Sequence, residues 1–98
     1  MKTVAICGSM RYESEMKKIA FDLEANKEFC VLQCVYNEEK RELSDQIIER
    51  LNKAHYRKIQ LADAIYVVDI DGYIGEQVRK EITFAEANSK EIIFHSDC

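Results

Sequence analysis

The stretch AIYVVDI, Ala64–Ile70, decides the fold together with the segment DGYIG at residues 71–75. It is the most strand-like run in the chain, because apolar and β-branched side chains dominate it. Asp71 and Gly72 are typical turn-forming residues. The sequence therefore predicts a buried strand that ends in a loop.

The segments on either side of this strand have helical periodicity. Upstream, Ser44 is a candidate N-cap for a helix whose apolar stripe is formed by Ile47, Ile48, Leu51, His55, Ile59 and Ala62. Asp63 ends that helix. Downstream, a helix is expected over residues 76–88, and the run EIIFH at 91–95 predicts a further strand.

The N-terminal third adds two more strands and one helix. The run TVAIC, Thr3–Cys7, is apolar and stops at Gly8 and Ser9, as a buried strand does at a tight turn. Residues 12–26 have an apolar stripe at helical spacing, and FCVLQCV at 29–35 predicts a second buried strand. The expected order is βαβαβαβ.

Strands that alternate with helices imply right-handed crossovers and parallel neighbours. We expect an α/β fold of the Rossmann or flavodoxin type, with a small open parallel sheet in the strand order 2-1-3-4 and helices on both faces. In this order the winding reverses between the first and third strands, and ligands bind in the crevice beside that point.

Composition narrows the class of protein. A chain of 98 residues is expected to form one domain over residues 1–98, and its 33% of charged residues suits a soluble protein. With 14 basic against 18 acidic residues and no basic run, a nucleic-acid polymer is not an expected partner. No apolar run has the length of a signal-peptide core or a membrane span, so the expected location is cytoplasmic, without a membrane partner.

The four cysteines are expected to be reduced. Cys7 and Cys30 fall inside apolar strand-like runs, where small buried thiols are common. The alternative is a zinc site formed by Cys30, Cys34, Cys98 and a histidine, but their spacing contains no CxxC pair. We therefore expect neither a metal nor a cofactor.

A candidate anion site follows the first strand. In Gly8-Ser9-Met10-Arg11 the glycine permits a sharp turn, and free amides with the Ser9 hydroxyl point outward. Arg11 adds paired donors for a phosphate or carboxylate. The alternative is an ordinary turn capped by Ser9, with Arg11 in solvent.

Two ionisable residues lie on stripes that should face the sheet. Glu81 has the helical spacing of Val78, Ile82 and Ala85, and a buried carboxylate is costly unless it is compensated. Burial also raises the pKa of a carboxyl group, as many catalytic acids require. The alternative is an ion pair between Glu81 and a nearby basic residue. His55 is similarly placed, either as a catalytic group or as a satisfied core histidine.

The loop after the third strand supplies further candidates at the mouth of the crevice. Asp69 can accept a hydrogen bond from a ribose hydroxyl, Tyr73 can stack on a base, and Asp71 and Gly75 lie in the same loop. Turn-forming aspartates and an exposed tyrosine are equally ordinary without a ligand.

Taken together, these residues resemble the nucleoside 2-deoxyribosyltransferase-like family, and within it the small 2'-deoxynucleoside 5'-monophosphate N-hydrolases. The likeness spans nearly the whole chain in four pieces. They are a CGS-x-R phosphate loop at 7–11, an "AD" strand entry at 62–63, an E-x(3)-A segment at 81–85 and a K-x-I segment at 90–92.

The resemblance implies an enzyme that cleaves the N-glycosidic bond of a small nucleoside or nucleotide, by hydrolysis or transfer. Glu81 would be the nucleophile, and His55 stands where the relatives carry an acidic residue for work on the base. Gly8, Ser9 and Arg11 would hold the 5'-phosphate, and the loop at 69–75 would contact sugar or base. The resemblance also implies a homodimer.

Two other functions remain open on the sequence. One is a nucleotide-binding or regulatory module of the same fold that does not turn its ligand over. The other is a flavin-binding protein, because GS-x-R after the first strand also resembles the phosphate loop of flavodoxin-like FMN reductases. Those reductases are usually much longer.

Overall fold

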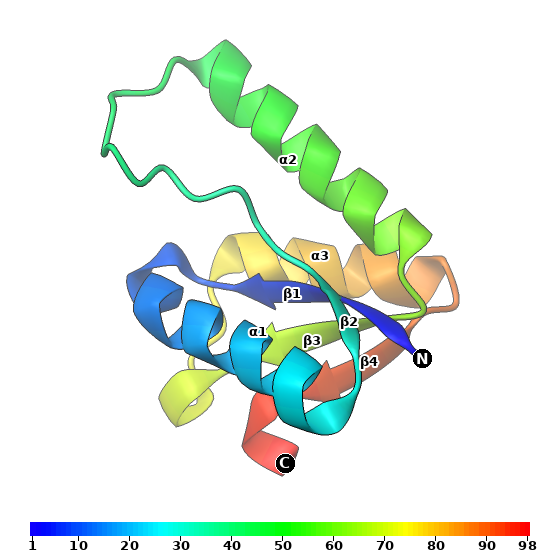
Figure 1. Ribbon diagram of the computed structural model, residues 1–98. Coiled ribbons are helices and arrows are strands. Elements are labelled where there is room, and N and C mark those ends of the chain that lie inside the picture. The colour runs from blue at the N-terminus through cyan, green and yellow to red at the C-terminus, as the bar shows by residue number, and fades with distance from the viewer.

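The computed structural model describes residues 1–98 and contains four strands and three α-helices (Figure 1). The strands and helices run, in chain order, β1 Thr3–Gly8, α1 Glu13–Lys27, β2 Cys30–Leu32, α2 Asp45–Leu61, β3 Ala64–Val68, α3 Glu76–Ala87 and β4 Glu91–Phe94. Short 3-10 turns cover Met10–Tyr12, Ile70–Gly72 and His95–Asp97.

The four strands form one parallel sheet in the order β2-β1-β3-β4. The longest pairing joins β1 to β3, from Val4 opposite Ala64 to Gly8 opposite Val68. This confirms the predicted order and the predicted α/β class. The C-terminal ends of β1 and β3 therefore lie next to each other at the point where the winding reverses.

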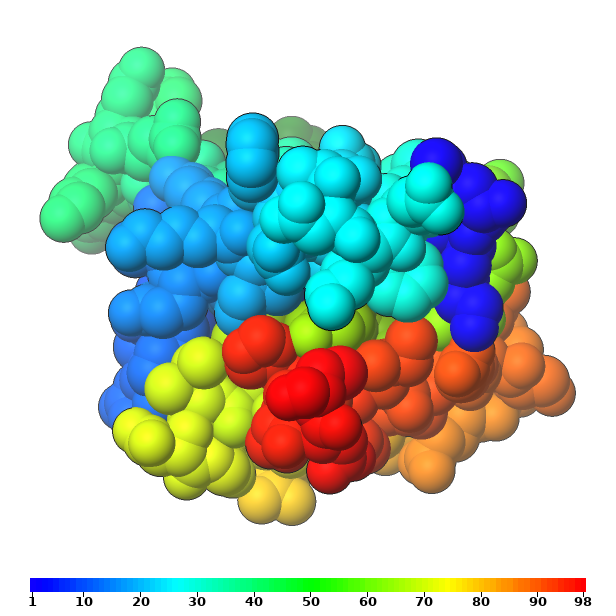
Figure 2. Space-filling view, turned by 60° about the horizontal axis from the view of Figure 1, so that its bottom comes forward, coloured from blue at the N-terminus to red at the C-terminus, as the bar shows by residue number.

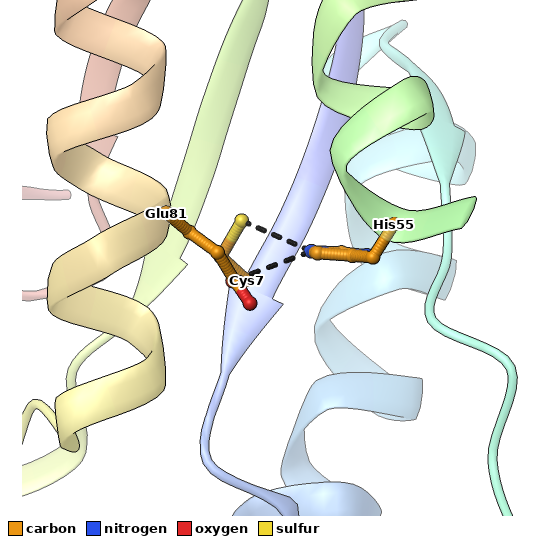
Figure 3. A group of neighbouring side chains, drawn as sticks. All are labelled: Cys7, His55 and Glu81. Carbon is orange, nitrogen blue, oxygen red and sulfur yellow. Dashed lines mark hydrogen bonds and ion pairs between the residues drawn. The ribbon is translucent and has the colours of Figure 1, made fainter. Parts of the chain in front are cut away.

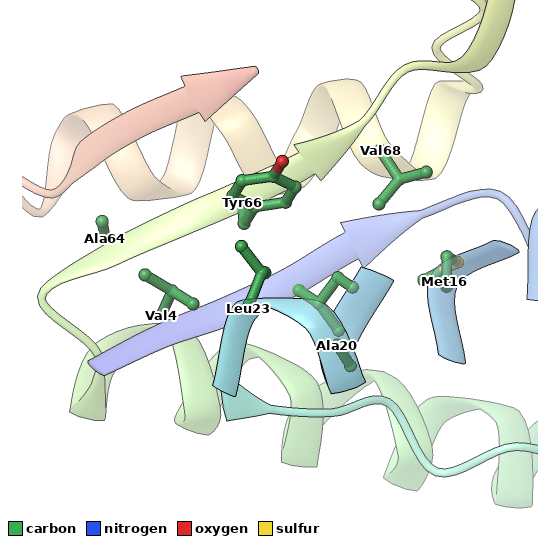
Figure 4. Close-up of a cluster of buried hydrophobic side chains, with 8 residues drawn as sticks. Val4, Met16, Ala20, Leu23, Ala64, Tyr66 and Val68 are labelled. Carbon is green, nitrogen blue, oxygen red and sulfur yellow. The ribbon is translucent and has the colours of Figure 1, made fainter. Parts of the chain in front are cut away.

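Alternate residues of the central strands face two different cores. Val4 and Ile6 face α1 and pack with Met16, Ala20 and Leu23 (Figure 4). The residues between them face the opposite side of the sheet, where α2 and α3 lie; that core contains Ala5, Cys7, Ile59, Ala62, Ile65, Val67, Val78 and Ala85. Because Cys7 is the last of its set before the strand ends, it lies under the helices near the crevice.

The second and third strands are shorter than the sequence predicts. The expected strand over 29–35 is reduced to Cys30–Leu32, because only those residues pair with β1. β3 ends at Val68, opposite the last residue of β1, rather than at Ile70. Ile70–Gly72 instead form a 3-10 turn in which Asp71 has a φ of 53°.

The helix α2 packs on the sheet with only part of its length. Ser44 is its N-cap, as predicted, and the Ser44 hydroxyl accepts a hydrogen bond from the Ile47 amide. The expectation that Ile47 and Ile48 share the buried stripe is wrong, because each is 42% exposed. A helix of 17 residues is about 25 Å long, whereas the six residues of β1 span about 20 Å. The two lengths differ by only about one turn, and Ile48 lines the cavity between α2 and the start of α3. The N-terminal part of α2 is thus exposed because it stands away from the sheet (Figure 1).

The connection between β2 and α2 also lies away from the sheet. This segment projects from the body of the molecule in both the ribbon and the space-filling view (Figures 1 and 2). It is internally braced, because the Asn37 side chain donates to the Arg41 carbonyl and accepts from the Arg41 amide. None of the helices has both the length and the apolar character that crossing a bilayer requires.

Candidate functional site

Three side chains from three different elements meet on the α2 and α3 side of the sheet (Figure 3). Cys7 comes from the end of β1, His55 from α2 and Glu81 from α3. The Nε2 atom of His55 lies 3.4 Å from the Cys7 Sγ and 3.3 Å from the Glu81 Oε1. The sequence predicted that His55 and Glu81 face the core, but not that they face each other.

Glu81 is buried on α3 between Val78 and Ala85, and only 6% of it is exposed. Its partner is His55 rather than a neighbouring arginine or lysine. The second carboxylate oxygen, Oε2, accepts a hydrogen bond of 3.2 Å from the Gln77 side-chain amide. The same amide donates to the Tyr56 hydroxyl at 3.3 Å. Both oxygens of this buried carboxylate are thus compensated.

The electrostatics of the trio favour a protonated histidine and a protonated thiol. Burial raises the pKa of the Cys7 thiol to about 12, which keeps it neutral. Burial alone would lower the pKa of His55, but its interactions with Cys34, Cys7 and Glu81 outweigh burial and raise that pKa above its usual value. Histidine and glutamate therefore form an ion pair with little exposure to solvent.

Two members of the trio, His55 and Glu81, border a cavity of about 780 Å³ at the C-terminal end of β1, and Cys7 lies buried behind them. The cavity lies between the turn after β1, the β2–α2 connection, α2 and the start of α3. Of the residues that sequence reasoning selected, the ones that line it are Gly8, Ser9, His55, Tyr73, Gly75 and Glu81. This volume is within the range of small-molecule sites.

The remaining predicted site residues do not line this cavity. The guanidinium of Arg11 lies over the Tyr73 ring, 4.3 Å from its centroid. The carboxylate of Asp69 accepts hydrogen bonds from the backbone amide and the hydroxyl of Ser96, at 2.8 and 2.6 Å. Asp71 is exposed in the 3-10 turn.

The turn after β1 also has the local cap that the sequence suggested. The Ser9 hydroxyl accepts from the Arg11 amide at 3.4 Å and caps the Met10–Tyr12 turn. Gly8 is favoured there for a steric reason, because a Cβ at this position would lie 2.9 Å from the Met16 sulfur and 3.2 Å from the Val68 Cβ, so these side chains would have to shift.

Sequence reasoning missed two members of the site. Cys7 was predicted as a buried thiol at the start of the CGS-x-R segment and not as a site residue, although its place at the end of β1 on the α2 and α3 face could have linked it to His55 and Glu81. Gln77 gave no signal in the sequence. The β2–α2 connection also forms a wall of the cavity with Lys40 and Arg41, and neither residue was among the predicted site residues.

All four cysteines are unpaired, and the side chains that could together hold a metal are Cys7, His55 and Glu81. That group contains none of Cys30, Cys34 and Cys98, so the zinc site considered from the sequence does not form. The ligand atoms of the group lie within 4.8 Å of one another.

The sheet and its crevice define a doubly wound parallel α/β protein with a cavity at the switch point. The fold is similar to that of the solved CMP N-glycosidase BcmB from Clostridium botulinum, with a TM-score of 0.62. The superposition covers 95% of this chain and 70% of the glycosidase chain, at 21% sequence identity. At this identity the likeness establishes a shared fold. No protein-family model and no curated protein matches the sequence.

Proposed function

We propose that the protein is an N-glycosidase or deoxyribosyltransferase of the nucleoside 2-deoxyribosyltransferase-like family, acting on a small (deoxy)nucleoside or nucleoside 5'-monophosphate. The observation that carries this proposal is Glu81, a buried carboxylate that borders a cavity at the ends of the central strands. Burying a carboxylate destabilises the folded protein, so its presence here indicates a functional or structural role. The shared fold with a CMP N-glycosidase supports the same reaction class.

In the proposed reaction, a Glu81 oxygen attacks the anomeric carbon of the bound sugar and the C–N bond to the base breaks. The base leaves with the bonding electron pair, and the imidazolium of His55 supplies its proton. The sugar is then held as an ester of Glu81. Water or a second base attacks the same carbon and releases the carboxylate, as in retaining glycoside hydrolysis.

The cavity lining suggests how a substrate would be oriented. Gly8 and Ser9 at the end of β1 would contact a 5'-phosphate, and Tyr73 and Gly75 would contact sugar or base. Arg11 would reach the phosphate only if its guanidinium left the Tyr73 ring. Asp69 has no part in this proposal, because Ser96 occupies both of its oxygens.

The test is base release from a panel of ribo- and deoxyribonucleosides and their 5'-monophosphates, followed by liquid chromatography. We expect release with the native chain and a loss of more than about 10³-fold in Glu81→Ala, because the nucleophile is removed. The matched control is Glu86→Ala, which removes an exposed glutamate from the same helix. Equal activity in Glu81→Ala and Glu86→Ala would contradict the proposal.

A non-catalytic nucleotide-binding module is the second candidate. It is favoured by the partners of Glu81, since His55 and Gln77 already engage both carboxylate oxygens. In that case, a nucleoside monophosphate would raise the melting temperature of the protein while no free base appeared.

A further inference from the structure

The contacts of His55 Nε2 are unusual for a hydrogen-bonded trio. This one atom faces both the Cys7 Sγ at 3.4 Å and the Glu81 Oε1 at 3.3 Å. A ring nitrogen carries at most one hydrogen, so it cannot be aligned with both partners. Charge-assisted N–H···O bonds are also shorter, about 2.7–2.9 Å. The separation between His55 and Glu81 is therefore longer than that of a direct, charge-assisted hydrogen bond.

The same spacing suits a tetrahedral metal ion. With zinc bond lengths of about 2.3 Å to sulfur and about 2.0–2.2 Å to nitrogen and oxygen, the edges of a tetrahedron are roughly 3.5 Å for S···N and roughly 3.4 Å for N···O. The observed separations are 3.4 and 3.3 Å. Two of the three ligand–ligand distances therefore match those of a zinc site, and the third, between the Cys7 Sγ and a Glu81 oxygen, is within 4.8 Å.

The charges of the three ligands and their positions in the fold also favour Zn²⁺. A Cys7 thiolate and a Glu81 carboxylate would neutralise the two charges of Zn²⁺, with His55 as a neutral ligand, so no net charge would be buried. Thiolate, imidazole and carboxylate together form a donor set that suits zinc. β1, α2 and α3 each supply one ligand, and these elements pack together in one core. The ligands are therefore positioned before the metal binds.

We propose that Cys7, His55 and Glu81 form a binding site for Zn²⁺. Because His55 and Glu81 line the cavity, a water molecule from it would complete the tetrahedron. On binding, the Cys7 thiol and the His55 Nε2 each lose a proton to solvent, and the ion takes their place. If the proposed function holds, zinc inhibits the enzyme, because a metal-bound Glu81 oxygen cannot attack a sugar.

The affinity is expected to be lower than that of closed structural zinc sites. A zinc-bound histidine normally donates its other ring N–H to a protein acceptor. The Nδ1 of His55 is buried without any partner. The site also has three protein ligands rather than four.

The direct test is a titration of the metal-free full chain with Co²⁺ as a spectroscopic substitute for zinc. We expect one ion per chain, visible-region bands of tetrahedral intensity and a near-ultraviolet thiolate-to-cobalt charge-transfer band, all displaced by Zn²⁺. A spectrum of octahedral cobalt without the thiolate band would overturn the proposal, and this result needs no variant.

Variants then assign the ligands. Cys7→Ser should abolish the charge-transfer band, and His55→Gln should weaken zinc binding at least about 10-fold, as measured against a chromophoric chelator. Cys98→Ser removes an exposed thiol and should leave both measurements unchanged. Loss of the band in Cys98→Ser, with retention in Cys7→Ser, would overturn the assignment. If circular dichroism shows that Cys7→Ser does not fold, the other two variants test the site. Weaker zinc binding in His55→Gln than in Cys98→Ser would support it, and equal binding would overturn it.

The inhibitory consequence has its own measurement. Base release by the native chain should fall when one equivalent of Zn²⁺ is added and return with EDTA. Undiminished release from zinc-loaded protein would contradict inhibition, whereas no release from metal-free protein would count against the proposed function. The cobalt spectrum decides the metal site in either case.

Discussion

At the residue scale, His55 links Glu81 to the rest of the candidate site. It contacts Glu81 from α3 and Cys7 from β1, and the Cys34 thiol also acts on it from the segment after β2. The raised pKa of His55 means that folding favours its protonated form. If the proposed function holds, this one side chain supplies both a counter-charge for Glu81 and an acid for the departing base.

This protonation makes the contribution of His55 to stability depend on pH. Its pKa is higher in the folded than in the unfolded protein, so its contribution is fully present below the unfolded value of about 6.5 and is lost as pH rises towards the folded value. In the presence of EDTA, the free energy of unfolding of the native chain relative to His55→Gln should fall between pH 6 and pH 9, by at most about 1.4 kcal/mol per pH unit.

Urea denaturation at a series of pH values measures this difference, with His95→Gln as the matched control. His95 follows β4 and lies beside the hydroxyl of Tyr66, whose ring belongs to the core on the α1 side. A difference between native and His55→Gln protein that grows as pH rises would contradict the raised pKa.

Some of this residue-level picture was available from the sequence and some was not. The burial of Glu81 could be predicted, because its spacing with Val78 and Ala85 assigns it to the covered face of the helix. Its contact with His55 could not, because that distance depends on how two helices far apart in sequence rest on the same sheet.

At the element scale, the turn after β1 depends on a close approach between backbone and side chains. A methyl group on Gly8 would meet Met16 and Val68, which belong to the packed core on the α1 side. Gly8→Ala should therefore lower the free energy of unfolding by about 1–3 kcal/mol. Gly75→Ala is the matched control, because its nearest contact would be the Tyr73 hydroxyl at an ordinary 3.5 Å.

Urea denaturation of the two variants checks this prediction. We expect Gly75→Ala to lose less than about 1 kcal/mol, the range of a helix-cap effect. Equal losses in the two variants would show that the β1 turn has more room than the structure indicates.

Strands and helices could be predicted from the sequence where burial determines which residues are apolar. The run from Ala64 to Val68 is buried on both faces and was identified from its composition. The exposure of the first turns of α2 was not, because the apolar stripe continues from Ile59 back to Ile48, whereas that part of the helix borders the cavity instead of packing on the sheet. Periodicity reports the covered face of a helix, not how much of its length is covered.

At the scale of the whole molecule, the uncovered part of α2 bears on assembly. Ile47 and Ile48 are 42% exposed, and Val35 on the neighbouring segment is 66% exposed. Val35 and Ile48 line the cavity, whereas Ile47 does not. Exposed apolar side chains beside a cavity are often covered by a partner. The homodimer that the family resemblance implies would give them one.

Light scattering after size exclusion tests this expectation. We expect a particle of twice the 11.4 kDa chain mass, and a shift to the single-chain mass in Ile47→Asp. Phe21→Asp places the same charge on α1, where Phe21 is 75% exposed, and should leave the mass unchanged. A native protein that elutes as a single chain at high concentration would contradict the dimer.

The mass of the protein trapped during turnover tests most directly whether Glu81 is the nucleophile. The metal-free chain, mixed with a substrate that it cleaves and quenched in acid within the first turnovers, should gain the mass of one glycosyl group, and peptide mapping should place it on Glu81. Glu86→Ala should gain the same mass. An unmodified chain during active base release, or a glycosyl group on any other residue, would contradict a Glu81 nucleophile.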